Sequence, residues 1–487
     1  MSAASSTCAA GVLLALLVVA GQFASFSWEV IDWDESTFMV MAQDLLRGRL
    51  PYLGLYDNKP PLIFFLFAGV MALFGPGIDA IRWFGDVCIW AAAMMIFIVL
   101  RPRAGVPVAI AVAAAFAGVH LAYAYTGTEI VANVFVAGAL LLLIDHGGKP
   151  WSSWAVGLLL ALAALTRSNL IFIVVAVGLI YLSAIVTPAF RQRRGAVVGY
   201  VLGGLAAPLL LVLLYAGQGG LDELWLANVV VPLSYASGQA HPWSVLNDGF
   251  AWSIRSAGTG LVAVMLVGLG AALLPPRAPT DSGLPVAAIV LLAILLSIVL
   301  GGVFYGHYGI QLYVPAALLA GLAVGTARWR RLLVGGMAAL VAVFCTVLGL
   351  MAASDRIAAL RDGADLRPLK SLAVEIAADR NPGDTLWARG GHLLLVYLDE
   401  PPLSPLAAHP DNLLRSEIRD PLVAAGYVPP DEFGRLLAER PRHIVIRSWE
   451  RDFNGWSWPR VNLLMLLVRD YSVWRELPGL VVYRRND

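Results

Sequence analysis

Long apolar runs, each close to the roughly 20 residues that a helix needs to cross a bilayer, fill the chain from its start to about position 350. Charged residues make up only 14% of the sequence, whereas soluble domains carry about 25%. A chain with so few charges is solvated largely by lipid rather than by water. We therefore predict a mainly α-helical, polytopic membrane protein.

A length of about 20 apolar residues per span places about eleven transmembrane helices in this sequence. They lie near 9–28, 79–100, 105–124, 127–145, 152–166, 168–187, 196–216, 256–275, 284–303, 309–326 and 331–352. The apolar stretch 62–75 is shorter, which favours an interfacial or re-entrant helix. The first segment lacks the basic start of a secretory signal peptide, so we expect it to be retained as a helix.

Basic residues in the short loops indicate the orientation, because cytoplasmic loops carry an excess of lysine and arginine. With eleven spans all of these clusters fall on one side: Arg101, Arg103, Lys149, Arg191, Arg193, Arg194, Arg277, Arg328, Arg330 and Arg331. We therefore predict a multi-pass protein of the inner (plasma) membrane with a cytoplasmic N-terminus. Its outer loops 29–78 and 217–255 and its C-terminal part would face the periplasm or the exterior.

Two domains are expected: a transmembrane domain at 1–354 and an extracytoplasmic domain at 355–487. The second alternates helix-like and strand-like pieces, which is typical of a small α/β domain. Helices are expected at 366–379 and 431–440, strands at 385–389, 443–448 and 480–485, and either type at 391–398. The three cysteines lie in or near apolar runs, which is typical of buried core residues rather than of a metal site.

The stretch from Asp32 to Leu62 gathers acids, a lysine and two prolines in a chain that is poor in charge. Polar residues beside a bilayer are costly, so such a group indicates a functional site. Asp34 and Glu35 follow the first span, and a carboxylate there can accept a proton from an attacking hydroxyl. The alternative is that Asp34 caps the next helix and Glu35 favours its positive end.

Lys59 lies just before two prolines that stiffen the chain. A lysine at the membrane interface can bind a lipid phosphate as a point charge. The alternative is an unspecific contact in which the lysine reaches out to lipid headgroups.

Further polar residues lie in or beside the predicted spans: Glu129, Arg167, His307 and Tyr308. An ionisable residue at membrane depth usually faces a cavity or a partner. A Glu129–Arg167 pair that only joins two helices is the alternative.

The Asp-Glu pair after the first span, an amphipathic stretch, a glycine and finally YDNKPPL resemble the first outer loop of the GT-C membrane glycosyltransferases. More narrowly, these residues are similar to the bacterial branch related to protein O-mannosyltransferases and the lipid A aminoarabinose transferase (glycosyltransferase family 39/83-like). The stretch HYGIQLYVP resembles a later segment of that branch. The resemblance covers the membrane region loosely and residues 32–75 and 305–320 well.

The resemblance implies a role for each matching residue. Asp34 matches the acid assigned as the catalytic base, and we expect a supporting role for Glu35. Lys59 matches the lysine that holds the lipid-linked phosphate, and Tyr56 matches an aromatic position beside it.

Two positions depart from the aminoarabinose branch. Thr37 stands where that branch has an arginine facing the phosphate, and Asn58 stands where it has an acid, although Asp57 is adjacent. The phosphate then needs another cation, for which Arg167 and His307 are the candidates. We expect Tyr308 on the donor side as well, and Asp57 and Glu129 as possible substrate-binding residues.

Residues and resemblance together predict an enzyme: a membrane glycosyltransferase that moves a hexosyl or pentosyl group from a polyprenyl-phosphate donor. The acceptor would be a hydroxyl of an envelope glycolipid, polysaccharide or protein on the outer face. The expected partners are therefore the donor, the acceptor and membrane lipid. We expect no nucleic acid partner. A phosphate leaving group does not demand a metal, so no cofactor is expected, with a divalent metal left open. A lipid or sugar flippase and a non-catalytic assembly factor remain as alternatives.

Overall fold

The computed structural model describes residues 3–120, 125–183, 190–237, 283–302, 304–324, 328–365, 367–406, 412–448 and 458–486, with short pieces at 243–245, 247–248, 251 and 409. The chain divides into two compact units. The first comprises Met1–Ser27, Arg82–Leu214 and Gln239–Asp362. The second comprises Trp28–Ile81, Tyr215–Gly238 and Gly363–Asp487.

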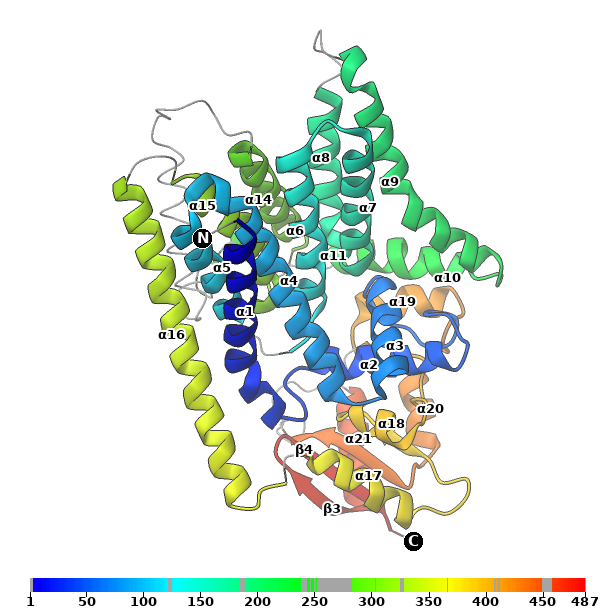
Figure 1. The fold of residues 1–487 in the computed structure, drawn as a ribbon. Helices are drawn as coiled ribbons and strands as arrows, with labels where there is room; N and C mark the ends of the chain where they lie inside the picture. The colour runs from blue at the N-terminus through cyan, green and yellow to red at the C-terminus, as the bar shows by residue number, and fades with distance from the viewer. Residues whose placement is uncertain are drawn as a thin grey trace. The chain divides into compact units, whose positions relative to one another are not determined.

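The first unit is helical (Figure 1). Its elements are α1 (Ala3–Gln22), η1 (Phe23–Ser27), most of α4 (Ile78–Ala104), α5 (Val106–Val119), α6 (Thr128–His146), α7 (Pro150–Thr166), η3 (Ser168–Leu170), α8 (Ile171–Ser183), most of α9 (Phe190–Ala216), α14 (Gly283–Leu300), η6 (Gly306–Leu312), α15 (Tyr313–Leu322) and α16 (Arg328–Arg361). Helix α16 packs along α5 and α1, and α6 packs along α7.

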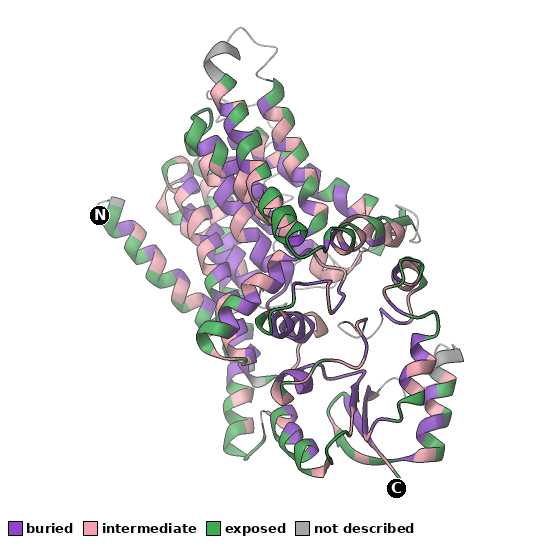
Figure 2. Cartoon of the chain, turned by 90° about the vertical axis from the view of Figure 1, so that its right-hand side faces the viewer, coloured by how far each residue is buried: buried purple, intermediate pink, exposed green. Residues whose placement is uncertain are grey.

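Six described helices are long and apolar enough to cross a membrane: Ala4–Gln22, Ile78–Ala104, Thr128–His146, Arg194–Ala216, Gly283–Leu300 and Arg328–Arg361. Figure 2 shows exposed positions along the helices of this unit, and many of the exposed residues are large and apolar. Leu210 and Leu213 on α9 are 70% and 69% exposed, and Leu340 on α16 is 71% exposed. Water would solvate such faces poorly, whereas lipid tails solvate them well. The prediction of a multi-pass membrane protein is confirmed.

A helix lies at every predicted span except 256–275, which falls outside the described residues. The number of spans stays a prediction. One segment needs a correction, because residues 306–312 form the 3-10 helix η6 before α15 begins at Tyr313. The short apolar stretch 62–75 forms a helix, α3 (Leu62–Phe74). Its interfacial or re-entrant placement stays a prediction.

Small residues let α7 and α9 approach each other closely. A Cβ atom on Gly157 would lie 2.1 Å from the carbonyl oxygen of Tyr200, and one on Gly203 would lie 1.9 Å from that of Trp154. Only glycine fits at these positions, which is the usual way for membrane helices to gain packing contacts. This contact fixes α7, whose C-cap residue is Arg167.

The second unit contains a four-stranded sheet of order β1-β2-β4-β3. Strands β1 (Leu386–Ala388) and β2 (His443–Arg447) are parallel, whereas β4 (Leu480–Arg485) is antiparallel to β2 and to β3 (Tyr471–Leu477). Its helical elements are α2 (Trp33–Leu46), α3, α10 (Leu221–Trp225), η5 (Leu226–Val230), α11 (Val231–Ser237), α17 (Pro368–Asp379), α18 (Leu393–Leu398), α19 (Ser416–Ala424), α20 (Glu432–Ala438) and α21 (Trp458–Asp470).

The segment 28–81 is bonded directly to the C-terminal part of the same unit. Gln43 on α2 donates to the carbonyl of Val396, at 3.3 Å, and to the carboxylate of Asp399, at 2.7 Å. Arg47 makes an ion pair with Asp399 at 2.8 Å. These contacts hold α2 against α18 and thereby fix the helix that carries Asp34.

The fold class is confirmed as mainly helical with a small C-terminal sheet. The expected C-terminal helices and strands are present as α17, α20, β1, β2 and β4, and the ambiguous stretch 391–398 forms α18. Strand β3 and helices α19 and α21 are additional elements that sequence analysis did not predict.

Candidate active-site residues

Helix α2 begins just before the acidic pair. Its N-cap is Asp32, whose carboxylate accepts the backbone N–H of Asp34 at 2.9 Å. The alternative in which Asp34 itself caps the helix is therefore wrong, because Asp32 fills that role. Glu35 lies in the first turn, as expected, and is buried.

The carboxylate of Asp34 instead lies 3.3 Å from the ammonium nitrogen of Lys59. The two side chains are only 16% and 18% exposed. Helix α2 and the following loop separate the two residues in sequence. The fold therefore brings a carboxylate and an ammonium group together from the two ends of the predicted functional loop. The pair gives the loop one proton acceptor and one cation at a single place.

The loop around Lys59 is fixed at its backbone from two sides. The Asp57 carboxylate accepts the N–H of Lys59 at 3.0 Å, and the Tyr52 hydroxyl donates to the carbonyl oxygen of Lys59 at 2.5 Å. Sequence analysis missed Tyr52, because a tyrosine seven residues before a lysine carries no motif. Its only sequence signal is its place in the polar loop.

Asp57 is buried, with 2% of its surface exposed. Burial raises the pKa of its carboxyl group to about 7, because removal from water disfavours the charged form. The charge of Asp34 raises this pKa further, whereas Lys59 and the backbone N–H groups lower it. The loop therefore contains a carboxyl group that titrates near neutral pH.

Tyr56 is buried in an aromatic cluster of the second unit. Its ring lies 6.3 Å from that of Tyr52 and 6.2 Å from that of Tyr427, and Tyr52 in turn lies 6.4 Å from Tyr215. The backbone N–H of Tyr56 donates to the carbonyl of Pro405 at 2.8 Å. Tyr56 therefore belongs to the buried aromatic cluster that packs beside the Lys59 loop.

The first unit holds a second cluster of the expected residues. Arg167, at the end of α7, makes an ion pair with Glu129 in the first turn of α6 and donates to Thr128 at 3.0 Å. The Nε2 atom of His307 lies 3.7 Å from the same Glu129 carboxylate. The guanidinium of Arg167 lies 4.4 Å above the ring of Tyr308. The sequence-based alternative of a Glu129–Arg167 pair is thus observed as a contact.

A polar network continues from this cluster. Asn169 donates to the side chains of Ser297, at 2.9 Å, and Gln311, at 2.8 Å. Asn133 donates to the backbone carbonyl of Ile310 at 3.0 Å. Sequence analysis did not single out Ser297, because one serine inside an apolar helix gives no signal of its own.

The expected site residues therefore form two clusters, one in each compact unit. The first unit contains Glu129, Arg167, His307 and Tyr308, and the second contains Asp34, Glu35, Tyr56, Asp57 and Lys59. Among the described residues, no three His, Cys, Asp or Glu side chains are grouped as a metal site would require.

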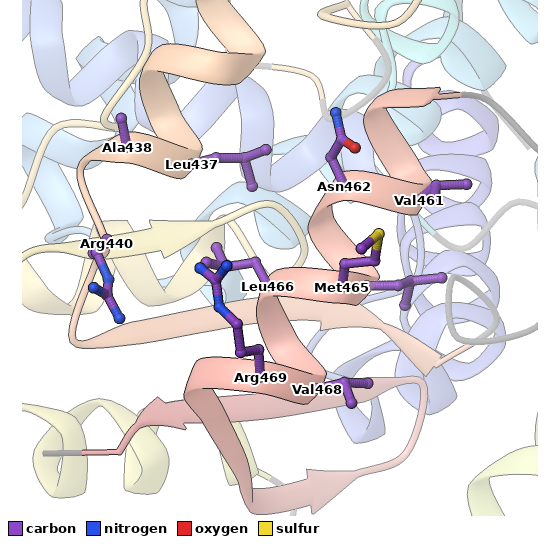
Figure 3. A pocket seen from close by; sticks show the side chains of 10 residues that line it. Leu437, Ala438, Arg440, Val461, Asn462, Met465, Leu466, Val468 and Arg469 are labelled. Atoms are coloured by element: carbon purple, nitrogen blue, oxygen red, sulfur yellow. The ribbon is translucent and has the colours of Figure 1, made fainter.

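A groove of about 720 Å³ lies between α20 and α21 in the second unit (Figure 3). Apolar side chains such as Met465 and Leu466 line it. Arg440 and Arg469 at its edge are both ion-paired with Asp470. None of the expected site residues lines this groove, so it is separate from the two clusters.

Residues 58–215 match a family model described as dolichyl-phosphate-mannose-protein mannosyltransferase. No curated protein matches the sequence. Two crystal structures of ArnT from Cupriavidus metallidurans are similar to this fold, each with 14% identity and a TM-score of 0.63. The one bound to undecaprenyl phosphate is matched over 97% of both chains, and the apo structure over 99% of this chain and 98% of its own.

A third similar structure is the Archaeoglobus fulgidus oligosaccharyltransferase in complex with Zn and sulfate. It shares 13% identity and a TM-score of 0.50, over 98% of this chain and 73% of its own. At sequence identities this low, the similarity shows a shared fold alone. The predicted resemblance is confirmed at the level of the fold: the chain has the GT-C fold seen in ArnT, and residues 58–215 match the dolichyl-phosphate-mannose-protein mannosyltransferase model.

Proposed function

We propose that this protein is a membrane glycosyltransferase that transfers a sugar from a polyprenyl-phosphate donor to an acceptor hydroxyl on the outer face of the inner membrane. The observation that carries the proposal is the Asp34–Lys59 pair, with 3.3 Å between carboxylate and ammonium. Sugar transfer from a lipid phosphate needs both groups: a cation for the phosphate and a base for the hydroxyl. The fold shared with an undecaprenyl-phosphate-bound ArnT supports this donor class.

The proposed reaction breaks the bond between the sugar's anomeric carbon and the phosphate oxygen. The electron pair of that bond leaves with the polyprenyl phosphate, and Lys59 neutralises the negative charge that develops there. The acceptor oxygen forms the new bond to the anomeric carbon. Its proton passes to the ionised carboxylate of Asp34, as general-base catalysis requires.

The other expected residues take supporting roles in this proposal. Glu35 lies beside Asp34 in the first turn of α2. The further cation for the donor phosphate is assigned to Arg167 or His307 of the first unit, and the ring of Tyr308 lies against the Arg167 guanidinium. Glu129 holds Arg167 through their ion pair. Tyr56 supports the loop that carries Lys59.

The proposal is tested with the purified full-length chain in lipid nanodiscs. The donor is a radiolabelled sugar on undecaprenyl phosphate, the acceptors are extracted envelope lipids, polysaccharides and proteins, and the label transferred is measured. Wild-type protein should transfer label. Asp34→Asn should lower turnover by about 100-fold, the usual size of a general-base effect, while donor binding is retained. Because Asp32 caps α2, the asparagine variant should keep its fold.

Lys59→Ala serves as the companion variant, and we expect weaker donor binding with an unchanged thermal melting point. Donor binding without any transfer by the wild type would favour a lipid flippase instead. Near-normal transfer by Asp34→Asn would leave the mechanism without its base and would reopen Asp57 and Glu129 as candidates.

A further inference from the structure

Tyr52 has an unusual backbone conformation in the loop between α2 and α3. Its φ angle is 70°, in the left-handed region that side chains other than glycine seldom adopt. Its N–H donates to the carbonyl of Leu55 at 2.9 Å, which closes a tight turn. Such a conformation persists only where the surrounding structure holds it, and it is common near functional sites.

The side chain of Tyr52 supplies that hold. It is 1% exposed, and its ring packs against those of Phe64 and Tyr215 at centroid distances of 6.3 and 6.4 Å. Burial raises the pKa of its hydroxyl well above the usual value, so the group stays protonated and can donate. The acceptor of its hydrogen bond is the main-chain carbonyl of Lys59, at 2.5 Å.

Tyr52 and Asp57 together fix the backbone of Lys59. Asp57 accepts the N–H of Lys59, and Tyr52 donates to its carbonyl oxygen. Both peptide groups flanking the Lys59 Cα are therefore bonded to buried side chains. A lysine side chain is a flexible stem with a point charge at its tip. When the backbone of a lysine is fixed, the region that its ammonium group can reach is smaller. Less conformational entropy is then lost when a phosphate binds.

We propose that Tyr52 is a positioning residue for polyprenyl phosphate: its hydroxyl orients Lys59 toward the phosphate and takes no part in group transfer. This inference rests on the proposed function, in which Lys59 binds the donor phosphate. It assigns a function to the strained turn, because the left-handed backbone at Tyr52 is what carries the hydroxyl to the Lys59 carbonyl.

The chain offers a matched control for this inference. Tyr215 is fully buried, and its hydroxyl donates to the carbonyl of Pro51 at 2.8 Å, directly before Tyr52. Tyr52→Phe and Tyr215→Phe each remove one phenol-to-carbonyl hydrogen bond from the same loop and keep the aromatic ring. Only the first of them removes a bond to Lys59.

The experiment measures binding of radiolabelled undecaprenyl phosphate to the full-length protein in nanodiscs. We expect Tyr52→Phe to weaken binding about fivefold to tenfold, the range that one lost hydrogen bond supports. Tyr215→Phe should stay within about twofold of wild type, because its bond does not reach Lys59. Undecaprenol, which lacks the phosphate, should bind all three proteins equally, since Lys59 recognises only the charged group.

A double-mutant cycle with Lys59→Ala separates positioning from a general effect on the loop. If Tyr52 acts through Lys59, adding Tyr52→Phe to Lys59→Ala should cause no further loss. An equal loss in both tyrosine variants, a further loss in the Lys59→Ala background, or wild-type binding by Tyr52→Phe would each overturn the inference alone. Wild-type binding by Lys59→Ala would overturn the proposed phosphate role, and this inference with it.

Discussion

Asp57 is the side chain of the Lys59 loop whose charge should change near neutral pH. Burial raises its pKa to about 7, so the carboxyl group is mostly neutral below that pH and mostly ionised above it. The charged groups that act on it are Lys59 and Asp34. An ionised Asp57 adds a negative charge beside the proposed phosphate position. We therefore expect affinity for polyprenyl phosphate to fall as pH rises through 7.

The Asp57→Asn variant should lose this dependence, because the amide stays neutral and its oxygen can still accept the Lys59 N–H. Dissociation constants for undecaprenyl phosphate would be measured from pH 6 to 8.5. Wild type should lose at least about fivefold more affinity than the variant, because two unit charges about 4 Å apart interact by about 1 kcal/mol even at the dielectric constant of water. Ionisation of the phosphate itself affects both proteins equally. Parallel curves for the two would contradict this role of Asp57.

Also at the residue scale, candidate site residues were easier to predict from the sequence than the contacts that each of them makes. Asp34 and Lys59 stand out because charged residues are rare in this chain, and the structure places them in contact. The cap of α2 could not be assigned, since Asp32 and Asp34 are chemically equal candidates until the helix start is known. The contact of Tyr52 with Lys59 could not be predicted, because it depends on a left-handed backbone conformation at Tyr52 that no local sequence motif indicates.

At the scale of elements, Glu29 caps helix α17 from a distant part of the chain. Its carboxylate accepts the N–H groups of Leu369, at 2.6 Å, and Lys370, at 3.2 Å. First-turn N–H groups have no partner within their own helix, and the preceding Arg367 supplies no side-chain cap. Glu29→Ala should therefore loosen the start of α17, at a cost of about 1 kcal/mol as for other lost caps.

Hydrogen–deuterium exchange of the amides in α17 checks this prediction. A loss of about 1 kcal/mol corresponds to roughly fivefold faster exchange at the first turn. Glu29→Gln keeps one carbonyl oxygen as an acceptor, so its effect should be intermediate. Unchanged protection of Leu369 and Lys370 in Glu29→Ala would show that the cap does not hold the helix.

Element types were predictable where one physical signal dominates. A membrane helix has to be long and apolar, so runs such as 79–100 and 127–145 identify α4 and α6 directly. Strand β3 gives a weaker signal, because it lies at the edge of the sheet and most of its side chains are exposed. Helix α21 ends directly at this strand, so no turn residues separate the two in sequence.

At the scale of the whole molecule, the predicted topology depends on where basic residues lie along the helices. Arg101 and Arg103 lie in the last turn of α4, Lys149 lies just before α7, and Arg328 begins α16. Since such residues stay in the cytoplasm, Asp487 is expected outside. Alkaline phosphatase fused after Asp487 should be active, and a fluorescent protein that matures only in the cytoplasm should stay dark there. Fusions after Lys149 provide the control, with the opposite pattern. Fluorescence after Asp487 would place the C-terminal part in the cytoplasm and would remove the argument for sugar transfer on the outer face.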